Sequence, residues 1–475
     1  MKLNYKNLIT YSNSVYQIGE KFNSLKRNNL NSKTKPKTAA KTIFSSMLWG
    51  CESINEIIQT NSNKDIDFKG IFSKKEFIPK THGLRDCIKD TDYKQIQTIN
   101  NEIIKKAKEN KIFRKNKVDG LVVVAWDGVE LTETTKNIKG LPEREHADGI
   151  RKYIKYTVAM NVGEKANILI DSEQLMEKEK VTTDSGAKRA KTTSETKQFE
   201  EMFEGVNKKM GTVDVHVMDA LYLNRNITNK INDNNQYFVI RLTDETRTIY
   251  KDAEELFDKN EPLNEYEIVE IITTKKVKYS KSAKKKDKEQ TKVRTEVRKI
   301  TSNKLGERIF VGEKTQHKKN STVYTKTYEK VTVRKKVWSG TFDMVGYEEP
   351  VRVIRSVETK YNGNKEIVNE IYLATNMLEH EVETILKIMH LRWNIENNGF
   401  RTLKQRFNLE HIFIGDINSI NYIVQMIFMV FNLLQLYMKI RLKNEINVAW
   451  HVITKSFMME MHNDKSLYLL FESCY

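Results

Sequence analysis

Apolar residues recur at helical spacing through the first 115 residues of the chain. The stretch KTAAKTIFSSMLWG at 37–50 carries its large apolar residues on one helical face and ends on Gly50, a common helix stop. The stretch DYKQIQTINNEIIKKAKENKIF at 92–113 repeats this pattern. Residues 1–115 are therefore predicted to form a helical region with a basic surface.

Residues 119–128, DGLVVVAWDG, begin a different pattern. The run is almost wholly apolar until Asp127 and Gly128, so it is predicted to form a buried strand that ends there. Two more strand patterns follow at 153–162 and 166–173. Three strands in succession indicate the start of a sheet.

A helix and a fourth strand are predicted next. SETKQFEEMFEGVNKKMG at 194–211 has apolar residues on one helical face and Gly211 as its C-cap. VDVHVMDALYLN, which starts at Val213, alternates like a strand until Asp219. With the preceding strands, these elements form the predicted first part of an α/β domain, 116–235.

Residues 236–362 are rich in alternating β-branched and aromatic side chains, which predicts a β-rich insertion. A fifth strand, EIVNEIYLATN, is expected at 366–376, and the helix after it completes the α/β domain over 363–412. A helical C-terminal region, 413–475, follows. The predicted fold class is therefore α/β: a mixed five-stranded sheet flanked by helices, interrupted by a β-rich insertion, with helical regions at both ends.

The segment YIVQMIFMVFNLLQLYMKI, 422–440, is apolar enough to raise the question of a membrane span. It is only marginally long enough to cross a bilayer, and Gln425, Asn432 and Gln435 interrupt it. We interpret it as a buried helix and expect no membrane partner. The first 20 residues lack the apolar core of a signal peptide, so a cytoplasmic protein is expected.

The chain is strongly basic, with a formal net charge of +18 and a pI of about 9.3. Such a charge favours a polyanionic partner, of which nucleic acid is the commonest. Half of it lies in residues 275–299, which hold Lys284, Lys285 and Lys286; this segment is either a DNA clamp or a solvated loop. Three cysteines without CxxC spacing argue against a disulfide framework and against a zinc site.

Three carboxylates have an unusual context. Asp127 and Asp219 each end a predicted strand, where the rim of a sheet partly desolvates them, and Glu396 lies one helical turn after Arg392. Carboxylates converging without His or Cys make an all-oxygen site that suits Mg²⁺, and paired Mg²⁺ ions can cleave or join phosphodiesters. The alternative is two turn aspartates and an ordinary i, i+4 salt bridge.

Together these motifs resemble the DDE transposases of bacterial insertion sequences, in the superfamily with a Tyr-Arg-Glu-Lys signature around the third acid. VVVAWDG resembles the strand of the first Asp, VHVMDALYLN that of the second, and LRWNIENNGFRTLKQRFNLEH the helix of the third acid. The resemblance spans roughly residues 119–411. It implies a ribonuclease H-like fold and cleavage of DNA that depends on Mg²⁺ or, in its place, Mn²⁺.

The resemblance also implies roles for individual residues. Asp127, Asp219 and Glu396 match the catalytic metal ligands of the family. Arg392 and Lys404 match residues that contact DNA phosphates near the cut. The helical region 1–115 is expected to bind DNA as well.

The third motif departs from the family in two places. Met389 stands where the tyrosine is expected, and Lys404 follows Glu396 by eight residues instead of seven, which turns it by about 100°. The intervening residues, Asn397-Asn398-Gly399, are poor helix formers. A π-bulge there would absorb the extra residue and return Lys404 to the face of Glu396, so a helix break is predicted.

Trp338, in the β-rich insertion, has two interpretations. The resemblance implies an aromatic residue there that stacks on a base flipped out beside the cut. Alternatively, Trp338 packs between the insertion and the catalytic domain, because tryptophan is usually mostly buried.

The function implied by the resemblance is that of a DNA transposase. Such an enzyme binds terminal inverted repeats, cleaves the transposon ends and joins their 3′-hydroxyls to target DNA. We expect a homodimer on paired double-stranded ends, in the bacterial cytoplasm at the nucleoid. A ribonuclease H-like nuclease without strand transfer and a catalytically idle DNA-binding protein derived from a transposase are the alternatives.

Overall fold

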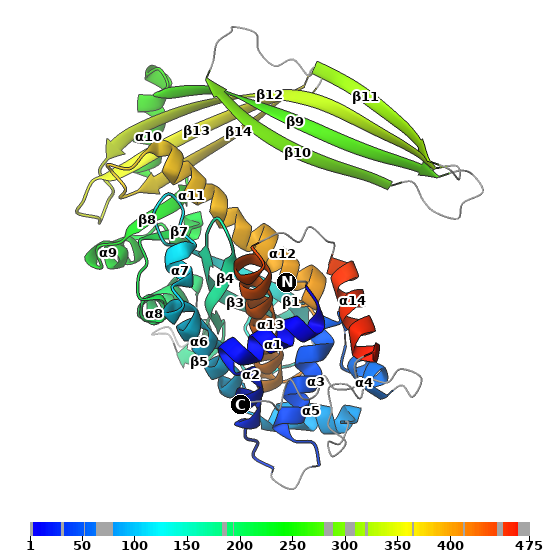
Figure 1. The fold of residues 1–475 in the computed structure, drawn as a ribbon. Helices are drawn as coiled ribbons and strands as arrows, with labels where there is room; N and C mark the ends of the chain where they lie inside the picture. Colours follow the sequence, from blue (N-terminus) through cyan, green and yellow to red (C-terminus); the bar gives the residue numbers. More distant parts are fainter. Residues whose placement is uncertain are drawn as a thin grey trace. The chain divides into compact units, whose positions relative to one another are not determined.

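The computed structural model describes residues 3–29, 33–51, 53–62, 79–182, 188–192, 194–279, 288–299, 309–318, 322–362, 365–411, 414–443 and 450–463. Its residue contacts divide the chain into two compact units (Figure 1). Unit 1 comprises Met1–Tyr222, Lys230–Tyr237 and Glu383–Tyr475, and unit 2 comprises Leu223–Asn229 and Phe238–Val382.

The described part of residues 1–115 is mainly helical, as predicted. The stretch at 37–50 forms α3, and the chain leaves it through Gly50 at φ +78°, a conformation that favours glycine. The stretch at 92–113 forms α6 and α7. The helices are α1 (Tyr5–Tyr16), α2 (Ile18–Asn23), α3 (Pro36–Leu48), α4 (Ile54–Ser62), α5 (Thr81–Asp90), α6 (Lys94–Glu109) and α7 (Ile112–Lys115).

The sheet of unit 1 mixes parallel and antiparallel pairs. Strand β3 lies antiparallel to both β1 and β4, and β7 lies parallel to β1, so the order is β4–β3–β1–β7. The predicted strands at 153–162 and 166–173 are β3 and β4. The strands are β1 (Val123–Thr134), β2 (Glu143–His146, paired with β3), β3 (Gly149–Val162), β4 (Asn167–Gln174), β7 (Val215–Met218) and a separate hairpin of β5 (Glu177–Thr182) and β6 (Lys188–Thr192).

The prediction that the first strand ends at Asp127 and Gly128 is wrong. Strand β1 continues to Thr134, paired with β3 over this whole length. The reason is that Val129 and Leu131 are buried and alternate with more exposed residues, so one face of the extended strand still packs on the core. Asp127 therefore lies within a strand, where its backbone is paired with Val158 of β3.

Helix α8 (Glu195–Met210) covers one face of this sheet. Ser194 caps its N-terminus, and Gly211, at φ +80°, caps its C-terminus as predicted. Phe199 packs edge-on against Trp126 of β1, with 4.5 Å between ring centroids. Trp126 also donates to the Nδ1 of the buried His216 on β7 (2.9 Å), so this tryptophan is a packing residue.

The apolar segment 422–440 lies in a buried helix, α13 (Ile417–Gln435), which continues as the π-helix η4 (Leu436–Arg441). By length and composition this is the one helix in the described part of the chain that could cross a membrane, yet 78 % of its most apolar window is buried inside unit 1. Its polar interruptions have partners on β4: Asn432 binds both backbone groups of Leu169 (2.8 and 2.9 Å), and Gln425 donates to Ser172 (3.1 Å). The helix thus protects the edge strand of the sheet.

The remaining helices of unit 1 include the predicted third-acid helix. It is α11 (Val382–Asn394), followed without a gap by the π-helix η3 (Ile395–Phe400) and by α12 (Arg401–Phe407). The predicted break at Asn397-Asn398-Gly399 is confirmed, because these residues lie in the π-helix. Further short elements are η2 (Ala220–Tyr222), α9 (Arg225–Asp233) and α14 (Trp450–Asn463).

Unit 2 consists mainly of a long antiparallel sheet, which confirms the predicted β-rich insertion. Its strand order is β10–β9–β12–β13–β14–β8, with β11 also paired to β12. Helix α10 (Thr248–Lys259) interrupts the insertion and was not predicted. The strands are β8 (Tyr237–Leu242), β9 (Asn264–Tyr279), β10 (Lys288–Lys299), β11 (Ile309–Lys318), β12 (Thr322–Phe342), β13 (Val351–Asn362) and β14 (Lys365–Thr375).

The basic segment 275–299 is described only at its ends. Residues 275–279 and 288–299 belong to β9 and β10, which pair with each other. Lys284, Lys285 and Lys286 lie outside the described residues.

The fold class is as predicted: α/β, of the ribonuclease H-like type, with a mixed sheet flanked by helices. The strands outnumber the five expected because the insertion contributes long strands of its own.

Candidate active site

Asp127 and Asp219 come from neighbouring parallel strands. Ala125 of β1 lies opposite Val217 of β7, and each aspartate lies two residues further along its own chain. The two strands run parallel, so both aspartates lie toward the same end of this strand pair, just beyond the point where the pairing of β1 with β7 ends. Asp219 follows the last residue of β7, as predicted.

Arg392 links the third predicted acid to this strand pair. One end of its guanidinium lies 2.8 Å from the carboxylate of Glu396, the i, i+4 partner, and another nitrogen lies 3.3 Å from Asp127 Oδ2. The Arg392 side chain is only 4 % exposed, whereas Glu396 is 47 % exposed. The buried cation therefore holds two carboxylates that come from different elements.

Lys404, the other predicted phosphate contact, lies on α12, just after the π-helix η3. It pairs with Glu410 at 2.8 Å, and no ion pair joins it to Glu396 in the described structure. The pKa of Glu130, on β1, is lowered chiefly by a hydrogen bond from Arg144 and further by the charges of Lys155 and Lys404. Lys404 is thus within electrostatic reach of a residue three positions after Asp127.

A fourth carboxylate, Glu195, lies beside Asp127 and was missed in the sequence. It begins α8, is 10 % exposed, and pairs with Lys155 of β3 at 2.5 Å. Its Oε2 accepts a hydrogen bond from the Tyr222 hydroxyl at 3.4 Å. In sequence it reads as an acid in the first turn of a helix, which is ordinary there, so no local signal marks it.

The four carboxylates, Asp127, Glu195, Asp219 and Glu396, are called the carboxylate cluster below. Burial raises the pKa of Asp127 to about 7; Arg392 opposes this rise, while the charges of Glu396 and Glu195 add to it. Burial also raises the pKa of Tyr222 well above its usual value, and the charges of Glu195, Asp127 and Asp219 raise it further. Tyr222 therefore lies within reach of three of the four acids, which groups Asp219 with the others.

The carboxylate cluster has the donor atoms that a hard cation prefers, but its present arrangement does not form a metal site. Within the described residues, no group of three or more His, Cys, Asp and Glu side chains is arranged to hold a metal ion. The donors are nevertheless all carboxylate oxygens, as Mg²⁺ prefers. The pKa of Asp127 is raised chiefly because burial disfavours its charged form, even with Arg392 beside it.

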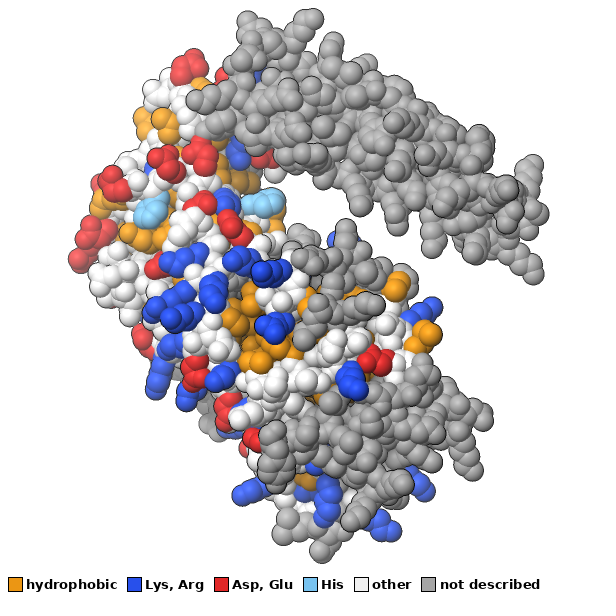
Figure 2. All heavy atoms as spheres, viewed as in Figure 1, with side chains coloured by type: hydrophobic (Ala, Val, Ile, Leu, Met, Phe, Trp, Pro, Cys, Tyr) orange, Lys and Arg blue, Asp and Glu red, His pale blue; other side chains and the backbone are white. Residues whose placement is uncertain are grey.

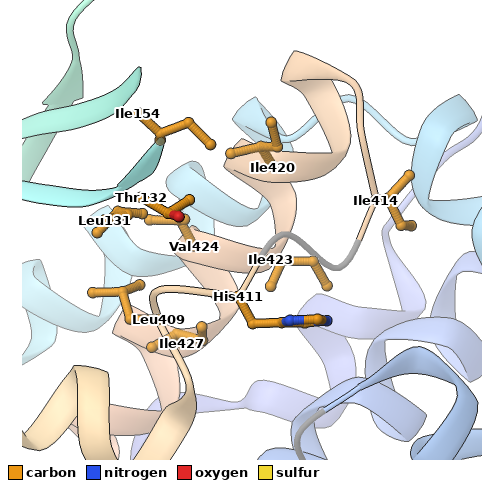
Figure 3. Close-up of a pocket in the computed structure, with 10 residues that line it drawn as sticks. All are labelled: Leu131, Thr132, Ile154, Leu409, His411, Ile414, Ile420, Ile423, Val424 and Ile427. Atoms are coloured by element: carbon orange, nitrogen blue, oxygen red, sulfur yellow. The ribbon is translucent and has the colours of Figure 1, made fainter. Parts of the chain in front are cut away.

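A small cavity in unit 1 is a packing gap instead of a site (Figure 3). It measures about 20 Å³ and is lined mostly by apolar side chains of β1, β3 and α13, such as Leu131, Ile154 and Val424. That is room for about one water molecule. No carboxylate lines it, so it cannot contribute to the carboxylate cluster.

Trp338 lies on β12 and makes contacts within unit 2. It is half-buried, its indole N–H donates to the backbone oxygen of Asn260 (2.9 Å), and the Arg355 guanidinium lies 5.0 Å from its ring centroid. Arg355 is itself paired with Asp258 and Glu370. These contacts lie within the insertion itself, so they show Trp338 packing there and not between the insertion and the catalytic domain.

A comparison with known families identifies the family of the chain. A family model, the transposase DDE domain, matches residues 163–433, more than half of the chain. This range includes Asp219 and Glu396, whereas Asp127 precedes it. No curated relative matches the chain. On the strength of the family match, the chain belongs to the transposase DDE domain family.

Proposed function

We propose that the chain is a metal-dependent DNA transposase of the superfamily with a Tyr-Arg-Glu-Lys signature. It binds terminal inverted repeats, cleaves transposon ends and joins the 3′-hydroxyls to target DNA. The observation that supports this proposal is that Arg392 pairs with both Asp127 and Glu396, while Asp219 directly follows β7, the parallel neighbour of β1.

Asp127, Asp219 and Glu396 are the residues that would hold the metal, either Mg²⁺ or Mn²⁺. The bound ion supplies Lewis-acid activation of a water or hydroxyl at a phosphodiester. Arg392 balances the charge of Asp127 and Glu396 in the metal-free chain, so it can contact a DNA phosphate only after it releases one of them. Lys404, which is 30 % exposed, is the more accessible phosphate contact.

The test is a cleavage and joining assay. Duplexes that carry the terminal repeats flanking the coding region are incubated with the protein and Mg²⁺, and cut and joined strands are resolved on a gel. Asp127→Asn, Asp219→Asn and Glu396→Gln should each abolish cutting and still bind DNA, because phosphate contacts do not need the metal ligands. Glu130→Gln, which removes another acid from β1, is the matched control and should cut normally. Wild-type cutting by any of the first three variants would remove that residue from the assignment.

The same assay separates the alternatives. Cutting without joined products would indicate a nuclease without strand transfer, and binding without cutting would indicate a catalytically idle protein. Because two ends must be joined in one event, we propose a homodimer that acts at the nucleoid of a bacterial cytoplasm.

A further inference from the structure

A basic pocket lies in unit 1 where α6, α7 and the end of α8 meet. Its volume is about 440 Å³, and Phe113, Val122 and Met210 form its apolar part. Four cations line it at intervals of three residues: Lys105, Lys108, Lys111 and Arg114. This pocket is called the α6–α7 pocket below.

The local backbone explains how the cations come together. Lys111 adopts φ +57°, which turns the chain sharply between α6 and α7. This turn lets Lys105 and Lys108 of α6 share one surface with Lys111 and Arg114. Gly211, at φ +80°, lies under Lys108: an added Cβ there would come within 2.4 Å of the lysine side chain. Lys108 donates to the Lys208 backbone oxygen (3.0 Å), which fixes it at the rim.

The charge of the pocket is largely uncompensated. Lys105, Lys111 and Arg114 are exposed, and none of them forms an ion pair with another described residue. Glu109, the one acid lining the pocket, is paired with Lys106 at 3.1 Å. Figure 2 shows Lys and Arg side chains gathering on the face of unit 1 that carries α6 and α7.

The pocket is separate from the carboxylate cluster. Val122, which lines it, precedes Asp127 by five residues along an extended segment, a distance of roughly 16 Å. A phosphate in the pocket therefore cannot be the phosphate that is cut.

We propose that the α6–α7 pocket is a second DNA contact, which binds backbone phosphates away from the cleavage point. Exposed, unpaired cations in a row suit the evenly spaced charges of a DNA strand, and they carry no sequence preference. The proposal rests on the proposed function only in taking DNA as the ligand, and it does not require the protein to cut.

The experiment measures binding of the full-length protein to a labelled 30-base-pair duplex of random sequence, without metal, over a range of salt concentrations. The test variant is Lys105→Gln/Lys111→Gln/Arg114→Gln. Removing one cation that neutralises a phosphate should reduce the slope of log K against log salt by about 0.9, so the expected reduction for the triple variant is roughly two to three. Affinity at physiological salt should fall at least about tenfold.

The matched control is Lys136→Gln/Lys139→Gln/Lys455→Gln, which removes the same charge from exposed lysines of unit 1 outside the helical region 1–115. This control should change the slope of log K against log salt by less than about 0.9, the effect of one phosphate contact. Equal losses of affinity in both variants would mean that only net charge matters and would overturn the proposal. An unchanged slope of log K against log salt in the test variant, together with a loss of ATP binding, would also overturn the proposal. The pocket would then be a site for small anions.

Melting temperatures of both variants should match the wild type, because the substituted side chains are exposed. Failure of the wild type to cleave DNA in the assay above would count against the proposed function alone, since the binding comparison uses no metal.

Discussion

The carboxylate of Glu195 lies directly against Gly128, the residue after Asp127. A Cβ added at Gly128 would come within 2.2 Å of Glu195 Oε2, closer than any real contact allows. Glu195 cannot easily move away, because Lys155 and Tyr222 hold it. The glycine is therefore needed for the close approach of α8 to β1 beside the carboxylate cluster.

Gly128→Ala should destabilise the protein by about 1–3 kcal/mol, the usual effect of overpacking, and should impair cleavage by shifting Asp127. Thermal unfolding and the cleavage assay measure the two effects. The double variant Gly128→Ala/Glu195→Ala removes the clashing carboxylate, so much of the stability should return. If the stability losses of Gly128→Ala and Glu195→Ala simply add in the double variant, the clash is not the cause of the destabilisation.

Arg392→Met should strongly destabilise the metal-free protein. It leaves Asp127 and Glu396 without their shared cation, and breaking a buried ion pair typically costs about 3–5 kcal/mol. Mg²⁺ should raise the melting temperature of this variant more than that of the wild type, because the carboxylates no longer have an internal counter-ion.

The control is Lys387→Met, on the same helix, which removes an exposed lysine that pairs with Asp119 and Glu164. It should cost at most about 1 kcal/mol and show no added response to Mg²⁺. An equal Mg²⁺ response in both variants would contradict the role of Arg392.

Local patterns were sufficient for some parts of this site and not for others. Asp219 could be located because its strand ends where the alternation ends, and the π-helix could be predicted from one extra residue and three poor helix formers. Asp127 was wrongly assigned to a strand end because Gly128 resembles a turn, whereas pairing with β3 carries β1 onward. The burial of Arg392 and the position of Glu195 depend on how α11 and α8 pack on the sheet, and no short stretch of sequence contains that information.

Deleting Asn398 should be tolerated. The π-helix η3 already holds one residue more than an α-helix would, so the deletion can convert it to α-helix and keep α12 in register. The melting temperature should change by only a few degrees. Deleting Thr402 from α12 is the control: it rotates the residues after it by about 100°, so the buried Leu403 and Phe407 should leave the core and stability should fall sharply. Similar losses of stability from both deletions would argue against a role for η3 as a one-residue insertion.

His216 should make the protein sensitive to acid. Burial lowers its pKa from 6.5 to about 4, although a hydrogen bond to Gln236 opposes the change, and Nδ1 accepts from Trp126, so the folded state keeps the ring neutral. The unfolded chain binds a proton near pH 6.5, so this contribution to stability is complete above pH 6.5 and is lost as the pH falls toward 4. Between pH 7.5 and 5 the loss is about 2 kcal/mol. Urea unfolding of the wild type and of His216→Gln over this range should show the extra loss in the wild type alone, and parallel pH profiles would contradict it.

Trp338→Ala should lower stability, because the side chain packs within unit 2. The substitution removes the bond to Asn260 and the ring under Arg355. A loss of about 1–3 kcal/mol is expected, with all steps of DNA cleavage slowed alike. Trp338→Phe keeps the ring under Arg355 but not the N–H, so it should recover part of the stability. If instead the melting temperature stayed at the wild-type value and only a late cleavage step slowed, Trp338 would stack on an extrahelical base, an interaction worth roughly 1–3 kcal/mol.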